Sequence, residues 1–298
     1  MNNKLEISIL DLGNTSTING HIMALQSTID CAILADKLEY KRYWLGENYA
    51  KTVAWNYPVP LMSILGGYTN NIRIGAGGII IKNHTPYKIV SDFSLLSTLF
   101  SNRIDLGIVG SSIDNYYESV LCAQNNNYKE NISDLIEFIE NDILKEKKMF
   151  NPYHENTSLS LKDNLWILGS GRYSIINASE NNLSYCYSIF HSTTELISEN
   201  YQNFLNQKLK FKQSSIALAG VCLERQANAI EAINDFKNKF YVPTVYGNKI
   251  EVKEKLNYYR KIFSVNEFVF FILTENTDEK IETINILSEI IHEINIEN

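Results

Sequence analysis

Eight short apolar segments alternate along this chain with segments whose apolar residues have helical spacing. The apolar segments cover residues 5–12, 42–46, 72–76, 103–109, 165–168, 184–190, 215–223 and 268–273. The predicted helices cover residues 24–38, 58–68, 87–100, 132–144, 194–205, 227–240, 252–263 and 281–294, with a further one around residues 175–178. Continuously apolar strands belong in a parallel sheet covered by helices. The sequence therefore predicts a single α/β domain over residues 1–298, a closed (β/α)8 TIM barrel, with an open doubly wound sheet as the alternative.

A polar, Asn-rich insertion follows the fourth predicted strand, at roughly residues 114–160. It contains one amphipathic helix, at 132–144, and a predicted loop at 151–157. Four tyrosines lie in or near it: Tyr116, Tyr117, Tyr128 and Tyr153. Long loops in compact domains are often functional. Two interpretations stay open, a surface loop or a substrate-binding rim over the barrel mouth.

Charge and motifs exclude several classes of function. The chain has 27 Lys and Arg against 34 Asp and Glu, a net charge of −7 without a basic tract, which argues against non-specific nucleic-acid binding. We see no signal peptide and no apolar span long enough to cross a bilayer, and so expect a cytoplasmic protein without a membrane partner. The five histidines lack metal-ligand spacing, and no nucleophile motif occurs. We expect no metal site, and chemistry that comes from a bound cofactor.

The stretch from residue 72 to 86 predicts one wall of a cofactor pocket. An apolar strand runs into Gly75, Gly77 and Gly78, and a polar corner with His84 and Thr85 follows before the next helix. Glycines at a strand end let a flat ligand lie against bare backbone.

A second glycine-containing turn, Gly169-Ser170-Gly171-Arg172, follows the fifth predicted strand and opens a helix. Backbone N–H groups at a helix start, beside a hydroxyl and a guanidinium, are typical of a phosphate site, although an ordinary strand-to-helix turn has the same pattern. A flat ring at Gly77 and Gly78 with a phosphate at Ser170 would suit flavin mononucleotide (FMN).

Polar residues at the carboxyl ends of barrel strands form a second set of candidates, because active sites of TIM barrels lie there. This rule selects Asp11, Glu47, Asn48, Gly77, Gly78, Gly110, Ser111, Ser170, His191, Glu224 and Thr274.

Over nearly its whole length the chain resembles the luciferase-like flavin-dependent oxidoreductases, the family that includes bacterial luciferase. The resemblance is carried by residues 9–11, 35–44, 72–78, 83–86, 103–107, 165–170, 245–247 and 252–256. It implies a (β/α)8 barrel that binds FMN, or in some branches the deazaflavin F420, and that forms a homodimer through helices beside strands two and three. It also implies a non-proline cis peptide at Gly77-Gly78 under the flavin ring. The predicted cofactor-binding residues are Asp11, Gly77, Gly78, Gly110, Ser111, Gly169, Ser170, Gly171 and Arg172.

Departures from the family pattern shape the expected reaction. Many members have Glu-His-His where this chain has Glu47-Asn48-Tyr49, and Asn does not exchange a proton near neutral pH. The family also tends to place an Arg at the position of Gly110, so Arg172 is expected to supply that charge. The segment after the seventh strand is too short for the mobile loop of the luciferase catalytic subunit.

We therefore expect hydride transfer between reduced FMN (or F420) and an organic substrate, with Asn48, Tyr49 and His84 as the catalytic residues and Tyr49 or His84 donating a proton. The substrate would be a small molecule or a peptide, such as a dehydroamino acid in a modified peptide. NAD(P)H would act as an indirect reductant through a flavin reductase. The alternatives are a monooxygenase that uses FMNH2 and O2, and a non-catalytic flavin-binding subunit.

Overall fold

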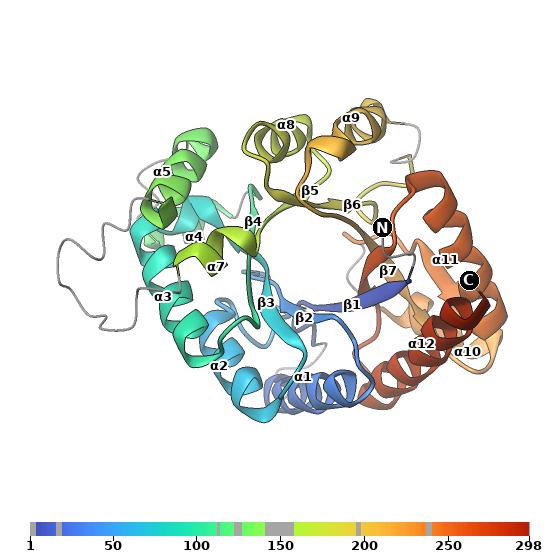
Figure 1. Cartoon of the computed structure of the whole chain (residues 1–298). Coiled ribbons are helices and arrows are strands. Elements are labelled where there is room, and N and C mark those ends of the chain that lie inside the picture. Colours follow the sequence, from blue (N-terminus) through green and yellow to red (C-terminus); the bar gives the residue numbers. More distant parts are fainter. Residues whose placement is uncertain are drawn as a thin grey trace.

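The chain folds into a closed barrel of eight parallel strands. The structure is a computed structural model that describes residues 4–15, 20–111, 114–121, 127–140, 158–194, 198–236 and 240–297. The strands follow in the order β6-β5-β4-β3-β2-β1-β9-β7, and pairing of β6 with β7 closes the ring (Figure 1). Their bounds are β1 Glu6–Asp11, β2 Arg42–Leu45, β3 Arg73–Ile80, β4 Ile104–Val109, β5 Leu165–Gly169, β6 Ser184–Ser188, β7 Ser214–Cys222 and β9 Glu267–Ile272. The predicted TIM barrel is confirmed, and the open sheet is wrong.

Helices surround the barrel and connect successive strands (Figure 1). They are α1 Gly20–Lys37, α2 Val59–Tyr68, α3 Pro86–Leu99, α4 Asn115–Val120, α5 Tyr128–Glu140, α7 Ser158–Asp163, α8 Arg172–Glu180, α9 Glu199–Gln207, α10 Gln226–Asp235, α11 Lys249–Phe263 and α12 Thr277–Glu297, with short 3-10 turns η1 Ile81–Asn83 and η4 Lys208–Lys210. None of the helices in these ranges is long and apolar enough to cross a membrane.

Several predicted segments differ from the structure. The helix predicted at 194–205 begins only at Glu199, where the Ser198 hydroxyl caps it by accepting a hydrogen bond from Tyr201 N at 3.0 Å. Between the helices predicted at 227–240 and 252–263, where no strand was predicted, lies a short strand, β8 (Val245–Gly247), which pairs with the end of β7. The insertion carries α4, α5 and α7, and its predicted loop at 151–157 lies outside the described residues.

Alternation along each strand divides the apolar side chains between two cores. Leu10, Trp44 and Trp166 belong to a cluster inside the barrel, whereas Ile9 and Tyr43 belong to a larger cluster between strands and helices. This is the period of two expected of a strand with both faces buried.

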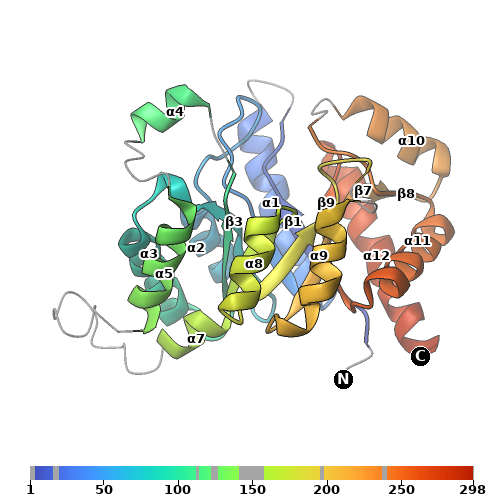
Figure 2. The ribbon, with the colours of Figure 1, turned by 90° about the horizontal axis from the view of Figure 1, so that it is seen from above.

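An ionic network lies at the amino-terminal ends of the strands. The buried Arg42 guanidinium donates to Asp105 Oδ2 and to Glu267 Oε1, both at 2.7 Å, and Arg73 pairs with Asp105 Oδ1 at 2.7 Å. Trp44 Nε1 donates to Asp105 Oδ2 at 3.0 Å. The network joins four strands at this end, so the opposite end, which bears the carboxyl ends of the strands, is left for a site. Figure 2 shows α4 and α10 at that end, away from both chain termini.

Candidate functional site

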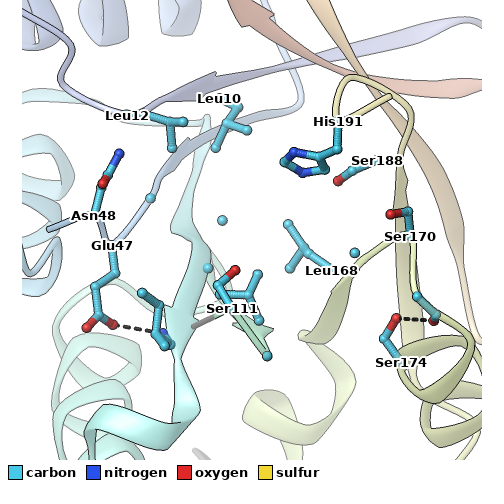
Figure 3. A pocket seen from close by; sticks show the side chains of 18 of the residues that line it. Leu10, Leu12, Glu47, Asn48, Ser111, Leu168, Ser170, Ser174, Ser188 and His191 are labelled. Atoms are coloured by element: carbon cyan, nitrogen blue, oxygen red, sulfur yellow. Dashed lines mark hydrogen bonds between the residues drawn. The ribbon is translucent and has the colours of Figure 1, made fainter. Parts of the chain in front are cut away.

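A cavity of about 950 Å³ opens at the carboxyl ends of the strands. Figure 3 shows it between the segment after β2, with Glu47 and Asn48, and the segments after β5 and β6, with Ser170 and His191. Nine of the twelve predicted site residues line it: Asn48, Tyr49, Gly77, Gly78, Gly110, Ser111, Gly169, Ser170 and Gly171. Within the described ranges, no group of three or more His, Cys, Asp or Glu residues could hold a metal ion.

Bare backbone forms one wall of the cavity at Gly77 and Gly78. The peptide bond between them is cis, as predicted, and the pairing of β3 with β4 shifts register between Ala76 and Ile79. A Cβ atom on Gly78 would lie 2.7 Å from the Gly107 carbonyl oxygen, and one on Gly107 would lie 2.1 Å from the Ala76 carbonyl oxygen. The backbones of β3 and β4 thus approach too closely for a side chain at Gly78 or Gly107. This leaves a flat backbone surface that suits a ring.

Glu47 fixes this wall from the end of β2. Its side chain is fully buried, and Oε2 accepts a hydrogen bond from Ile80 N at 2.8 Å. Oε1 accepts from Asn83 Nδ2 at 3.2 Å and lies 2.9 Å from His84 Nε2. The backbone N–H of Glu47 also donates to the Gly78 carbonyl at 3.2 Å. One carboxylate therefore holds together both ends of the turn that follows the cis peptide.

Asn48 and Tyr49 reach the cavity with different constraints. Asn48 Oδ1 accepts from Ala50 N at 2.9 Å, which orients the amide within its own loop. The Tyr49 ring packs against Tyr117 with centroids 5.1 Å apart. Burial and the neighbouring Glu47 carboxylate raise the pKa of Tyr49 above its ordinary value, so its phenol stays protonated near neutral pH.

The other end of the cavity is a cradle of small polar groups. Gly169, Ser170 and Gly171 end β5 and lead into α8, where Ser174 Oγ donates to the Gly171 carbonyl at 2.7 Å. A Cβ atom on Gly171 would touch nothing within 4 Å, so the backbone here is open. These features fit an anion held by the N–H groups at the start of α8.

Tyr128 closes the cradle on the side of β4. Its ring lies 3.0 Å from where a Cβ atom on Gly110 would stand, so it occupies the space beside this glycine. Its hydroxyl is buried and has no hydrogen-bond partner among the described residues. A buried hydroxyl that lacks a partner is costly, and a bound polar group would satisfy it. Of the two interpretations of the insertion, Tyr128 therefore fits the binding rim, and Tyr153 lies outside the described residues.

Three predicted site residues do not line the cavity. Asp11 is buried and accepts from Thr28 Oγ1 and the Tyr43 hydroxyl, at 2.8 and 2.9 Å, so it anchors β1 to the surrounding core. His84 is held behind the wall by Glu47. Arg172 is 64% exposed and lies 3.6 Å from Glu199 at the start of α9. The cation expected from Arg172 is therefore not at the cradle, because the side chain of this first α8 residue points toward α9.

Several lining residues were not among the twelve predicted catalytic and cofactor-binding residues, although His191 was one of the wider set of strand-end candidates. His191, Phe190 and Tyr241 come from the segments after β6 and before β8, and Lys82 comes from η1. The position of His191 after a strand was the only sequence signal for any of them. His191 is exposed to the cavity, but the protein atoms packed around its ring partly desolvate it and lower its pKa below its ordinary value.

Comparison with known proteins finds relatives of this chain in one family. Residues 6–140 match the family model described as luciferase-like monooxygenase. The chain is 25% identical over 334 aligned residues to YwcH of Bacillus subtilis, covering 96% of this chain and 98% of YwcH. It is 23% identical to the N-acetyl-S-alkylcysteine monooxygenase of B. subtilis, again covering 96% and 98%. The chain is thus similar to the luciferase-like family through residues 6–140, and to these relatives over nearly its whole length.

Solved structures share the fold over nearly the whole chain. Apo-MsnO8 superposes with a TM-score of 0.83 at 19% identity, covering 97% of this chain and 98% of its own. The oxygenating constituent of 3,6-diketocamphane monooxygenase from Pseudomonas putida, solved with FMN, gives a TM-score of 0.74 at 12% identity and coverage of 97% and 98%. An F420-dependent secondary alcohol dehydrogenase gives 0.65 at 11% identity, covering 96% and 98%. Proteins of this fold thus include flavin- and F420-dependent oxidoreductases and monooxygenases.

Proposed function

We propose that this protein is a flavin-dependent oxidoreductase that transfers a hydride between FMN and an organic substrate, with F420 as the alternative cofactor. The observation that carries the proposal is one cavity with a bare backbone wall at Gly77 and Gly78 and a cradle at Gly169–Gly171. A bound flavin would supply two-electron chemistry that no side chain provides.

The chain's own residues would bind and orient the cofactor. Gly77 and Gly78 would support the ring, with Glu47 holding their turn in place. The N–H groups at the start of α8 and the hydroxyls of Ser170 and Tyr128 would hold the phosphate. Among the lining residues that the structure describes, Lys82 is the only Lys or Arg. The cradle itself would therefore bind phosphate mainly through neutral donors.

Hydride transfer is favoured over oxygenation by the residues after β2. Asn48 offers an amide, which does not exchange a proton near neutral pH. The Tyr49 phenol remains protonated, and so it can donate a hydrogen bond to a substrate carbonyl without ionising. A small molecule or a peptide with an activated double bond, such as a dehydroamino acid, suits this set of groups.

Flavin titration tests the binding site. FMN fluorescence quenching is measured with wild-type protein, Gly171→Val and Gly67→Ala. A Cβ atom added to either Gly171 or Gly67 would have no neighbouring atom within 4 Å, but Gly67 lies on α2, outside the cavity lining. We expect Gly171→Val to lower FMN affinity about tenfold or more, a loss of about 1.4 kcal/mol per factor of ten, and Gly67→Ala to leave it unchanged. Equal affinities in all three proteins would rule out the cradle.

A monooxygenase that uses FMNH2 and O2 is the second candidate, and the named activity of the B. subtilis N-acetyl-S-alkylcysteine monooxygenase favours it. Rapid mixing of reduced, FMN-loaded protein with oxygen separates the two. Fast reoxidation of the flavin without a long-lived absorbance from an oxygenated flavin fits hydride transfer. A long-lived absorbance of that kind fits oxygenation. Failure to bind FMN or F420 would point to a changed cofactor, or to the third alternative in the form of a non-catalytic subunit that stabilises a partner.

Assembly and electron supply belong to the same proposal. Leu95 and Leu99 on α3 and Tyr68 on α2 are 58%, 59% and 62% exposed, and both helices flank β3. Exposed apolar side chains on neighbouring elements are typical of an interface. We propose that a homodimer forms there, and that NAD(P)H reduces the flavin indirectly, through a flavin reductase.

A further inference from the structure

His191 is the imidazole placed to serve the proposed cofactor site. It lies three residues beyond β6, and Figure 3 shows its ring projecting into the cavity, across from Asn48. Of the histidines in the described ranges, it alone lines the cavity. His84, the histidine predicted to act there, has its Nε2 2.9 Å from Glu47 Oε1.

Three aromatic rings that also line the cavity pack around the His191 imidazole. Its centroid lies 4.6 Å from that of Phe190, 5.7 Å from Phe240 and 6.2 Å from Tyr241. Tyr241 in turn packs edge-on against Phe271 of β9, with centroids 5.0 Å apart. The ring is thus held at the mouth by apolar contacts, while the face toward the cavity stays accessible.

Among the residues that the structure describes, no charged group contributes to the pKa shift of His191. Partial desolvation by the surrounding rings lowers its pKa, and burial raises the pKa of Tyr241, its titratable neighbour, to about 12. The charged lining residues Glu47, Lys82 and Asp114 come from the segments after β2, β3 and β4 and do not contribute to the shift at His191. A negative charge introduced into the cavity would raise the pKa of this imidazole.

We propose that His191 takes up one proton when the bound flavin is reduced and passes that proton to the substrate. The proposal rests on the proposed function. Reduction of the flavin, with electrons that come from NAD(P)H through the flavin reductase, adds two electrons and one proton to it, and so leaves one extra negative charge in the cavity. His191 balances that charge with a proton from water.

The return step balances in the same way. One atom of the substrate double bond receives the hydride, and the other receives the proton of the His191 imidazolium. The substrate gains two electrons and two protons, and the imidazole is neutral again. His191 therefore supplies from the β6 wall the proton that Asn48 does not supply from the β2 wall.

The pH dependence of the flavin midpoint potential tests this coupling without any substrate. Spectroelectrochemical titrations of FMN-loaded wild type, His191→Gln and His292→Gln are compared from about pH 6 to pH 8. In a two-electron couple, each tenfold change in proton concentration shifts the potential by about 30 mV for every proton taken up. We expect the wild type and His292→Gln, which changes an exposed residue of α12, to have slopes steeper than that of His191→Gln by about this amount.

The expected difference is confined to a pH window. It lies between the pKa of His191 with oxidised flavin and its higher pKa with reduced flavin, because only there does reduction add a proton to the ring. An NMR titration of the histidine rings measures both pKa values directly, with His191→Gln assigning the signal. We expect the His191 pKa to rise on flavin reduction and the His292 pKa to stay constant.

The outcomes distinguish a failure of the role proposed for His191 from a failure of the proposed flavin-dependent function. FMN binding with equal slopes in all three proteins, or an unchanged His191 pKa, overturns the role of His191 and leaves the proposed function standing. Absence of binding by both FMN and F420 overturns the proposed function and this inference with it.

Discussion

Replacing Glu47 with Gln should loosen the wall that carries the proposed flavin ring. The carboxylate is fully buried, and its two oxygens face three donors: Ile80 N at 2.8 Å, Asn83 Nδ2 at 3.2 Å and His84 Nε2 at 2.9 Å. A glutamine side chain has one acceptor oxygen. If that oxygen faces Asn83 and His84, its own amide faces the Ile80 N–H, which loses its partner.

The magnitude follows from that lost partner. A buried donor left without an acceptor costs about 1–3 kcal/mol. We therefore expect Glu47→Gln to lower the free energy of unfolding by about that much, and to weaken FMN binding at the same time because the turn after Gly78 is held less firmly.

Urea unfolding and FMN titration measure the two effects. Glu254→Gln, on the exposed side of α11, is the matched control and should change neither quantity. If Glu47→Gln unfolds at the wild-type urea concentration and binds FMN with wild-type affinity, the carboxylate does not hold this wall and the reasoning is wrong.

Further predictions concern the ionic network and the surface. Burial opposes ionisation of Asp105 and Glu267, but the charge of the buried Arg42 outweighs it and holds the pKa of both carboxyl groups below the ordinary range. The two carboxylates should therefore stabilise the fold above about pH 4, and this contribution to the free energy of unfolding should be lost on further acidification, as measured in urea melts. Asp105→Asn should cost about 3–5 kcal/mol and flatten that acid dependence, and an unchanged profile would refute it. Leu95→Glu should yield monomers in sedimentation, unlike Leu209→Glu, whose η4 side chain is 91% exposed; a dimer that survives Leu95→Glu would place the interface elsewhere.

The barrel strands were predictable because each is a short apolar run that both cores bury. All eight strands lie within one residue of their predicted starts, although β3 continues four residues past its predicted end at Ala76. Apolar spacing does not show where glycines continue a strand, and Gly77 and Gly78 do so here through backbone contact with β4. β8 was missed because three residues that pair only with the end of β7 leave no periodic signal.

The candidate site was predictable where backbone forms it and less so where side chains do. Gly77, Gly78 and Gly171 follow from turn chemistry and strand position. The direction of a side chain does not: Arg172 turns toward Glu199, and His84 turns back to Glu47. Contacts across the barrel are also invisible in local sequence, which is why the position of His191 among the aromatic rings emerged only from the fold.

A crystal structure of the protein grown with FMN tests the central claim most directly. The account predicts the isoalloxazine ring against the Gly77-Gly78 peptide and the phosphate within hydrogen-bond distance of Gly171 N and the Tyr128 hydroxyl. A flavin bound elsewhere in the molecule, or a phosphate turned away from the start of α8, would contradict it.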